Sequence, residues 1–304
     1  MIINIDPQQS LGYLLLADSL TEVGDYQSAI SNYNTAIQLE PHDKSAHINL
    51  GNAYKDIREY QKAMDHYQTA LEIDSADPTI YFNIGKVYKS VGQFDQAISQ
   101  YNKAIELNDK YTDCYTALGN LYYTIQDYET AKENYVKVIE LDPENEMGNF
   151  NLGLLAKIEG NFKKATEYYT KTISINPRNV SAQMNLGDIY AASGSFEEAR
   201  KCCNNVISEN PNDSGPYHKL GLYSNLAGEP EKAIDWLSKA IEMAPECAMY
   251  YFTRGEILMG LDKRNEALEE FEKVEKFANS VRERNILEKS QEYMKELGKE
   301  KKED

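Results

Sequence analysis

The sequence predicts an all-α fold made of paired helices that repeat along the chain. Three observations support this prediction: a sequence period of 34 residues, small residues at two positions of the period, and Gly or Pro at two others. The period runs from Ser10 to Val281 without an insertion or deletion, so one continuous array is predicted in place of the two domains that 304 residues suggest. The eight units are 10–43, 44–77, 78–111, 112–145, 146–179, 180–213, 214–247 and 248–281.

The first predicted helix of each unit has a small residue at its eighth position. Glycine inside a helix costs about 1 kcal/mol relative to alanine, so a periodic glycine predicts the close approach of a second helix. That second helix has alanine at position twenty of every unit, and we expect this alanine to meet the glycine. Large residues at positions seven, eleven and twenty-four form one apolar stripe on each helix. The residues at position eight are Ala17, Gly51, Gly85, Gly119, Gly153, Gly187, Gly221 and Gly255.

Glycine and proline mark the two turns of the unit. Glycine at position fifteen is predicted to turn the chain between the helices, and proline at position thirty-two to end the second helix, because proline breaks the helical hydrogen-bond pattern. The turn glycines are Gly24, Gly92, Gly160, Gly194 and Gly228, and the prolines are Pro41, Pro143, Pro177, Pro211 and Pro245.

This pattern closely resembles the tetratricopeptide repeat (TPR), over residues 10–281. The resemblance implies helix-turn-helix units stacked into a right-handed α-solenoid, a superhelix whose first helices line a concave, peptide-binding groove. Residues 282–304 keep a helical spacing of apolar residues, such as Tyr293 and Leu297. They are predicted to form a capping helix followed by a charged tail, because the last repeat of an array needs a cover for its apolar face.

The beginning of the chain has two interpretations. Residues 1–9 align with the last nine positions of a unit, such as the one that contains Asp142 and Pro143. They are either the tail of an incomplete preceding repeat, as in a fragment of a longer array, or an N-terminal arm that covers repeat one. Self-association through repeat one is a further hypothesis, because that end lacks a complete cap.

The groove that the resemblance implies has asparagines along it. In the family, positions two, five, six, nine, twelve and thirteen of the first helix face the concave side. A carboxamide both donates and accepts hydrogen bonds, so a row of them could hold an extended peptide backbone, similar to the asparagine ladder in the TPR half of O-linked N-acetylglucosamine transferases. Alternatively, these side chains bond within the array. They are Asn49, Asn83, Asn151 and Asn185 at position six. Asn52 and Asn120 at position nine are predicted to extend the polar lining of the groove.

Apolar and basic residues complete the predicted groove. Phe82 and Phe150 at position five would form apolar pockets for a peptide, or would be buried between helices. Four lysines map to the groove of repeats two to five, although 49 Asp and Glu outnumber 32 Lys and Arg in the chain and its net charge is −17. They predict a ligand of acidic character, the alternative being that they are solvated surface residues. These lysines are Lys55, Lys86, Lys89 and Lys157.

One known kind of TPR site is not predicted. The carboxylate clamp of co-chaperone TPR domains uses lysine at positions five and two of the first helix. No unit of this chain has lysine at either position.

Composition excludes several classes of partner and chemistry. The acidic balance argues against nucleic acid and anionic membranes as partners, and no apolar run approaches the roughly 20 residues of a membrane span. Four cysteines, two of them adjacent, form no disulfide framework and favour a reducing, cytoplasmic location. We expect buried thiols, and we predict no catalytic, metal-binding or cofactor-binding residue.

The function predicted from these observations is that of a noncatalytic protein–protein interaction scaffold. It would bind an extended peptide segment of a partner in the concave groove, within a multiprotein assembly. The alternatives are the substrate-recognition region of a larger enzyme, such as a protein O-glycosyltransferase, and a self-assembling scaffold.

Overall fold

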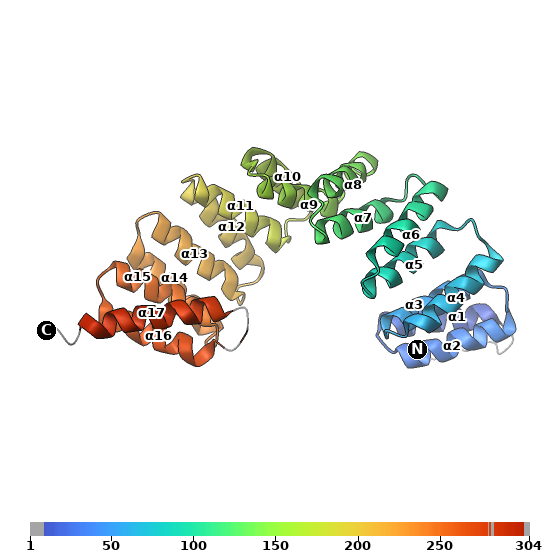
Figure 1. Cartoon of the computed structure of the whole chain (residues 1–304), viewed down its shortest axis with the longest axis horizontal. Helices are drawn as coiled ribbons and strands as arrows, with labels where there is room; N and C mark the ends of the chain where they lie inside the picture. Colours follow the sequence, from blue (N-terminus) through green and yellow to red (C-terminus); the bar gives the residue numbers. More distant parts are fainter. Residues whose placement is uncertain (1–8, 279, 281–282, 301–304) are drawn as a thin grey trace. The chain divides into compact units, whose positions relative to one another are not determined.

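The protein is described by a computed structural model over residues 9–278, 280 and 283–300. This part of the chain contains seventeen helices and no strand, which confirms the predicted all-α solenoid (Figure 1). The first helices of the pairs are α1 (Ser10–Glu22), α3 (Lys44–Asp56), α5 (Pro78–Ser90), α7 (Thr112–Thr124), α9 (Glu146–Ile158), α11 (Val180–Ala192), α13 (Ser214–Leu226) and α15 (Ala248–Gly260). The second helices are α2 (Tyr26–Leu39), α4 (Tyr60–Ile73), α6 (Phe94–Leu107), α8 (Tyr128–Leu141), α10 (Phe162–Ile175), α12 (Phe196–Glu209), α14 (Pro230–Met243) and α16 (Arg264–Phe277).

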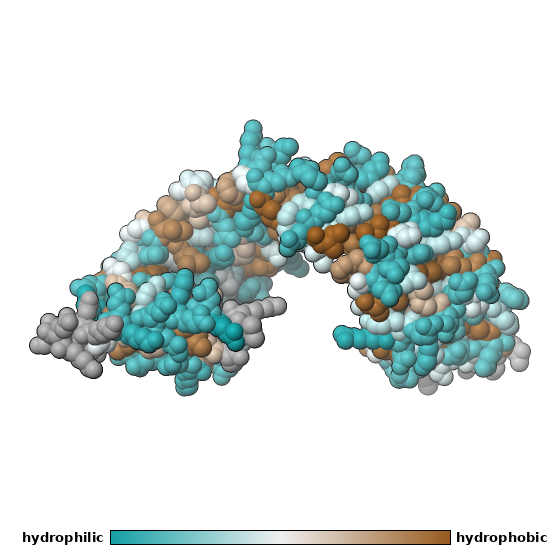
Figure 2. Space-filling model, in the orientation of Figure 1, coloured by the Kyte–Doolittle hydropathy of each residue, from teal (hydrophilic) through white to brown (hydrophobic). Residues whose placement is uncertain are grey.

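The chain divides into two compact units, one ending at Gly148 and one beginning at Asn149. Within each unit a helix packs most extensively on its pair partner, and then on the first helix of the next pair. Apolar side chains show in Figure 2 as strips between hydrophilic helix surfaces. The helix starts follow the predicted period, whereas the continuity of the array across Gly148 stays a prediction.

Short polar residues and positive backbone angles define the helix ends. Asp43 caps α3 by accepting a hydrogen bond from the Ser45 N–H at 2.8 Å, and Asp77 caps α5 in the same way. The five glycines at position fifteen have φ between 73° and 80°, which confirms their role in the turn. Arg58, Gln126 and Asp262 occupy the same position in other repeats with φ of 58–65°.

Most of the periodic glycines of the first helices face an aromatic ring. A Cβ atom placed on Gly51, Gly85 or Gly119 would lie 2.5–2.6 Å from the ring of the tyrosine at position twenty-four of the same repeat. In repeat eight the ring of Phe271 takes this place, 2.7 Å from a Cβ on Gly255. The expectation that alanine would meet the glycine holds only in part. In these repeats the nearest atoms belong to the aromatic ring, whereas in repeat seven a Cβ on Gly221 would lie 2.8 Å from Leu237 and 3.2 Å from the Ala233 carbonyl oxygen.

Replacing Gly255 by alanine is expected to destabilise unit 2. Overpacking costs about 1–3 kcal/mol, and this exceeds the gain of about 1 kcal/mol in helix propensity. Gly260 on the same helix is the matched control, because a Cβ there meets nothing within 4 Å. Urea unfolding followed by the fluorescence of Trp236, the single tryptophan of the chain, measures both variants. Equal unfolding midpoints for the two would contradict the packing argument.

The predicted capping helix is α17 (Arg284–Glu300), which packs on α15 and α16. Its buried Ile286 and Leu297 join a cluster that contains Phe271, and the Tyr293 ring lies 5.2 Å from the Phe271 ring. Residues 1–8, to which the hypothesis of an incomplete repeat or arm refers, lie outside the described residues, as do residues 301–304 of the charged tail.

Candidate functional site

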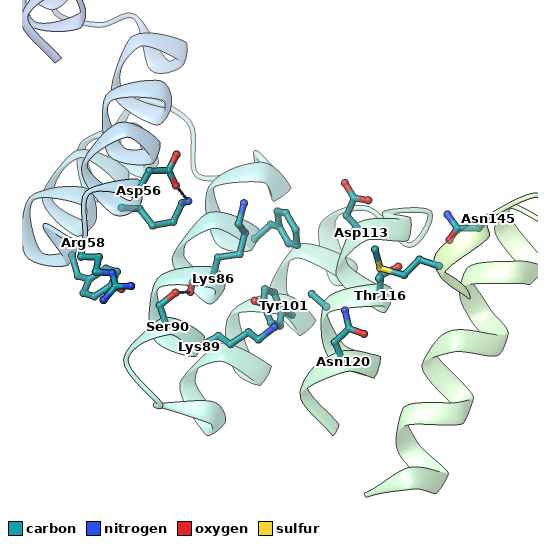
Figure 3. A pocket seen from close by; sticks show the side chains of 15 residues that line it. Asp56, Arg58, Lys86, Lys89, Ser90, Tyr101, Asp113, Thr116, Asn120 and Asn145 are labelled. Atoms are coloured by element: carbon teal, nitrogen blue, oxygen red, sulfur yellow. Dashed lines mark hydrogen bonds and ion pairs between the residues drawn. The ribbon is translucent and has the colours of Figure 1, made fainter. Parts of the chain in front are cut away.

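The candidate site is a cavity of about 670 Å³ in unit 1. Helix α5 contributes Phe82, Lys86 and Lys89, and Tyr101 on α6 lies beneath them. Figure 3 shows Lys86 and Lys89 extending from α5 into the space between α5 and α7. The remaining lining residues are Lys55, Asp56, Arg58, Tyr60 and Ser90 on one side, and Asp113, Thr116, Ala117, Asn120, Asn145 and Met147 on the other.

A hydrogen bond joins position nine to the tyrosine at position twenty-four in three repeats of unit 1. The hydroxyl of Tyr33 donates to Asp18 at 2.6 Å in repeat one. The corresponding tyrosines of repeats two and four donate to Asn52 at 2.7 Å and to Asn120 at 2.8 Å. The carbonyl oxygens of these two asparagines, which were predicted to extend the polar lining of the groove, therefore have partners inside the array.

Repeat three lacks this hydrogen bond. Position nine is Lys86, which has no acceptor atom, and the buried hydroxyl of Tyr101 has no hydrogen-bond partner among the described residues. Burial raises the pKa of Tyr101 above its usual range, so the hydroxyl keeps its proton at neutral pH. A buried hydroxyl without a partner costs about 1–3 kcal/mol. The array therefore gives up a stabilising hydrogen bond at the cavity.

Two lysines of α5 also form no ion pair with a described residue. No ion pair within the described residues involves Lys86 or Lys89, whereas Lys55 pairs with Asp56. The Lys86 ammonium lies 5.3 Å from the centre of the Phe82 ring, a cation–π contact. Burial, and then the Lys55 ammonium, lower the pKa of Lys86, while the Asp56 and Asp113 carboxylates oppose part of this shift. An anion bound here would stabilise the charged form of Lys86, which burial and the Lys55 ammonium disfavour.

The predicted groove lysine of unit 2 has partners. Lys157 donates a hydrogen bond to the side-chain oxygen of Asn185 at 2.8 Å and lies 3.8 Å from Asp188. Asp188 also pairs with Lys219 at 2.7 Å and accepts the Tyr223 hydroxyl at 2.8 Å. The charge of Lys157 is therefore compensated within unit 2, which leaves Lys86 and Lys89 as the predicted groove lysines without an acidic partner.

The other predicted groove residues lie largely within the array. Asn49 donates to Asp18 at 3.1 Å, and Asn83 is only 4% exposed. Asn151 is half-buried. The half-buried ring of Phe82 packs on Tyr101, and that of Phe150 packs on Tyr169. The asparagine ladder stays a prediction.

Sequence reasoning missed Tyr101, Arg58 and Met147 as cavity residues. A signal was present, because Lys86 is the only lysine at position nine of the eight units. Its significance depends on the hydrogen bond between positions nine and twenty-four, which only the structure shows. Arg58 reaches the cavity because it occupies the turn after α3 with a φ of 64°.

Metal-binding groups and thiols are the other candidates for chemistry among the described residues. No group of three His, Cys, Asp or Glu side chains there has an arrangement that could hold a metal ion. Cys202 and Cys203 are buried as predicted, and burial raises their thiol pKa to about 11 and about 12, so both are protonated at neutral pH. No described helix is both long and apolar enough to cross a membrane. The cytoplasmic location stays a prediction.

Four family models of repeats match the chain. The model described as "TPR repeat" matches residues 17–57, 59–92 and 85–126. Three models described as "Tetratricopeptide repeat" match residues 112–145, 156–221 and 215–247. A search of curated proteins found no match.

Solved structures of TPR proteins are similar to this chain. YrrB, described as a TPR protein with an unusual peptide-binding site, is 25% identical with a TM-score of 0.53, and the match covers 60% of this chain and 95% of YrrB. MamA is 26% identical with a TM-score of 0.53, over 58% of this chain and 96% of MamA. A tetratricopeptide repeat protein from Parabacteroides merdae is 20% identical with a TM-score of 0.50, and the match covers 95% of this chain and 98% of that protein. At this identity the likeness shows the fold alone. Together with the periodic helix pairs, the matches to the four family models show that the chain belongs to the tetratricopeptide repeat family.

Proposed function

We propose that this protein is a noncatalytic scaffold that binds an extended, acidic segment of a partner protein within a multiprotein assembly. The repeat architecture and the similar TPR structures support a role in protein–protein interaction. The binding site is the cavity in unit 1, on helices α3, α5 and α7. The observation that carries this proposal is the pair of lysines on α5 that lack a carboxylate partner inside an acidic chain.

The cavity has the features that peptide recognition requires. It combines apolar side chains, Phe82 and Ala117, with the 52% exposed Met147 and with polar groups on α7. Apolar pockets give a peptide its anchors, while polar groups orient its backbone. The likeness to YrrB, whose description names a peptide-binding site, supports the same class of ligand.

The charge of the ligand is selected locally. The chain carries a net charge of −17, which repels an acidic ligand at long range. Screening limits that repulsion to about 8 Å at physiological salt, so within the cavity the nearby lysines dominate. An acidic segment is therefore favoured at this place in spite of the overall charge.

Selection of random linear peptides on the intact protein tests this function. Peptides that bind are then measured against a double variant in the cavity, Lys86→Glu with Lys89→Glu. We expect the affinity to fall about tenfold or more, and the remaining affinity to depend less on salt concentration.

The matched control is the double variant Lys103→Glu with Lys137→Glu. It changes the net charge equally but on the exposed faces of α6 and α8, where these side chains are 49% and 43% exposed. We expect it to keep the affinity of the intact protein. The proposal fails if no linear peptide is selected, or if both double variants bind like the intact protein.

A further inference from the structure

We infer that repeat three contains a carboxylate-binding site, formed by Lys86, Lys89 and the hydroxyl of Tyr101, for an Asp or Glu side chain of the bound segment. This inference rests on the proposed peptide-binding function and specifies which group of the ligand is recognised. The site lies in the cavity of unit 1, where all three side chains are lining residues (Figure 3).

The missing partner of the site is a hydrogen-bond acceptor. In repeats one, two and four the tyrosine hydroxyl donates to Asp18, Asn52 or Asn120 at position nine. In repeat three the residue at that position is itself a donor, and the Tyr101 hydroxyl is buried without a partner among the described residues. An ionised carboxylate only accepts hydrogen bonds. A carboxylate of the ligand therefore supplies the hydrogen-bond acceptor for Tyr101 that Lys86 cannot provide.

The two ammonium groups approach the cavity from one side of α5. Lys86 and Lys89 are three residues apart and so lie on the same face of the helix. Neither forms an ion pair with a described residue, and burial already lowers the pKa of Lys86. A carboxylate next to them stabilises their charged forms and replaces the water that burial removes. The Tyr101 hydroxyl, as a hydrogen-bond donor, and the two positively charged lysines thus favour the same ligand group, a carboxylate.

The acidic residues of the cavity limit the negative charge that it accepts. Asp56 is paired with Lys55, and Asp113 lies on the α7 side of the cavity. Asp113 repels a second negative charge, so the site fits a single carboxylate better than a doubly charged phosphate. Ala117 and Met147 on the same side are apolar, so they can contact an uncharged residue next to the Asp or Glu of the bound peptide.

The arrangement exchanges stability for binding. A buried hydroxyl without a hydrogen-bond partner and a partly buried lysine without an ion pair are both unfavourable in the free protein. Residues that lose a stabilising interaction formed at the equivalent positions of other repeats are expected at functional sites. Placing a hydrogen-bond acceptor at position nine, as in repeats one, two and four, should therefore raise the stability of the protein and lower its affinity.

The test uses a capped peptide of six glutamates, with a capped peptide of six glutamines as the neutral control. We expect the intact protein to bind the glutamate peptide at least tenfold more tightly. In the variant Lys86→Asn, the new side chain should accept a hydrogen bond from the Tyr101 hydroxyl, as Asn52 and Asn120 do from the tyrosines of their own repeats. We expect this variant to have a higher Tm and an affinity for the glutamate peptide at least tenfold lower.

A pair of tyrosine variants separates binding from folding. Tyr101→Phe removes a hydroxyl that has no partner, so its Tm should not fall while its affinity for the glutamate peptide does. Tyr135→Phe removes a hydroxyl that donates to Asn120 at 2.8 Å, so its Tm should fall. Binding by Tyr135→Phe should stay like that of the intact protein.

Three results would overturn the carboxylate site. These are equal binding of the two peptides, unchanged affinity in both Lys86→Asn and Tyr101→Phe, and tighter binding of a peptide in which phosphoserine replaces the glutamates. The proposed function survives these results if selected acidic peptides still lose affinity in the double variant of Lys86 and Lys89. If the library yields no peptide at all, the function and the site fail together.

Discussion

Replacing Glu270 by alanine is expected to destabilise unit 2 by about 3–5 kcal/mol, because it removes one partner of a buried ion pair. The Arg254 guanidinium lies 2.8 Å from the Glu270 carboxylate, and the two side chains are 16% and 7% exposed. Arg254 also donates to Ser238 at 2.9 Å. The variant leaves the guanidinium buried on α15 without its counter-charge. Urea unfolding followed by the fluorescence of Trp236 in the same unit measures the loss.

Two further variants isolate the cause. Position seven is Leu or Ile in the other seven repeats, so Arg254→Leu combined with Glu270→Leu replaces the ion pair by apolar packing. This double variant should be close to the intact protein in stability. Glu266→Ala on the same helix breaks only an exposed pair with Lys263 and should change stability by less than about 1 kcal/mol. A similar loss from Glu270→Ala and Glu266→Ala would show that burial does not control the effect.

Acidification is expected to destabilise unit 2 through His218. Burial, and then the Lys219 ammonium, lower the pKa of His218 from its ordinary value of 6.5 to about 4. The imidazole Nε2 lies 3.1 Å from the Thr253 hydroxyl oxygen. That hydroxyl donates to the Met249 carbonyl, so it accepts from a neutral, Nε2-protonated imidazole.

The direction of the pH effect follows from the lowered pKa. Between pH 6.5 and 4 the unfolded chain takes up a proton at His218 that the folded chain does not. The contribution of His218 is therefore fully present above pH 6.5 and is lost as the pH falls to 4, by about 3 kcal/mol in total. Unfolding free energies from Trp236 fluorescence at several pH values between 7 and 4 measure the loss, as the difference between the intact protein and His218→Gln.

His42 provides the control for this experiment. It is exposed, so His42→Gln should leave the pH dependence of the intact protein unchanged. Carboxylates that titrate in the same range affect all three proteins equally and cancel in the comparison. A pH dependence of His218→Gln equal to that of the intact protein would refute the role of this histidine.

The fold was largely predictable because its signals are local. Helix starts, the Gly turn at position fifteen and the capping helix follow from residues close together in the sequence, and the structure has them where the period places them. The contact of Gly51 was predicted less well. Its close neighbour is the ring of Tyr67, although the sequence also offered Ala63 as the matching small residue. Spacing indicates which helix faces which, and the size and rotamer of each side chain decide which atoms meet.

The candidate site was predictable only in part. Lys86, Lys89 and Phe82 were predicted to lie in the groove and do line one cavity. Lys157 belongs to the same predicted set, but Asn185 and Asp188 hold its ammonium. The position of a residue in the repeat predicts the helix and the helix face on which its side chain lies. It does not say whether an acidic residue of another helix reaches it.

The amino-acid sequence by itself determined the helix pairs, their turns and the family, because these depend on periodicity and on local backbone preferences. Only the tertiary structure decided which polar groups have partners. The hydroxyls of Tyr67 and Tyr101 occupy equivalent positions, but one donates to Asn52 and the other has no partner among the described residues. The reason is that a hydrogen bond depends on distance and direction between side chains of different helices. The proposed carboxylate site is therefore a property of the packed helices.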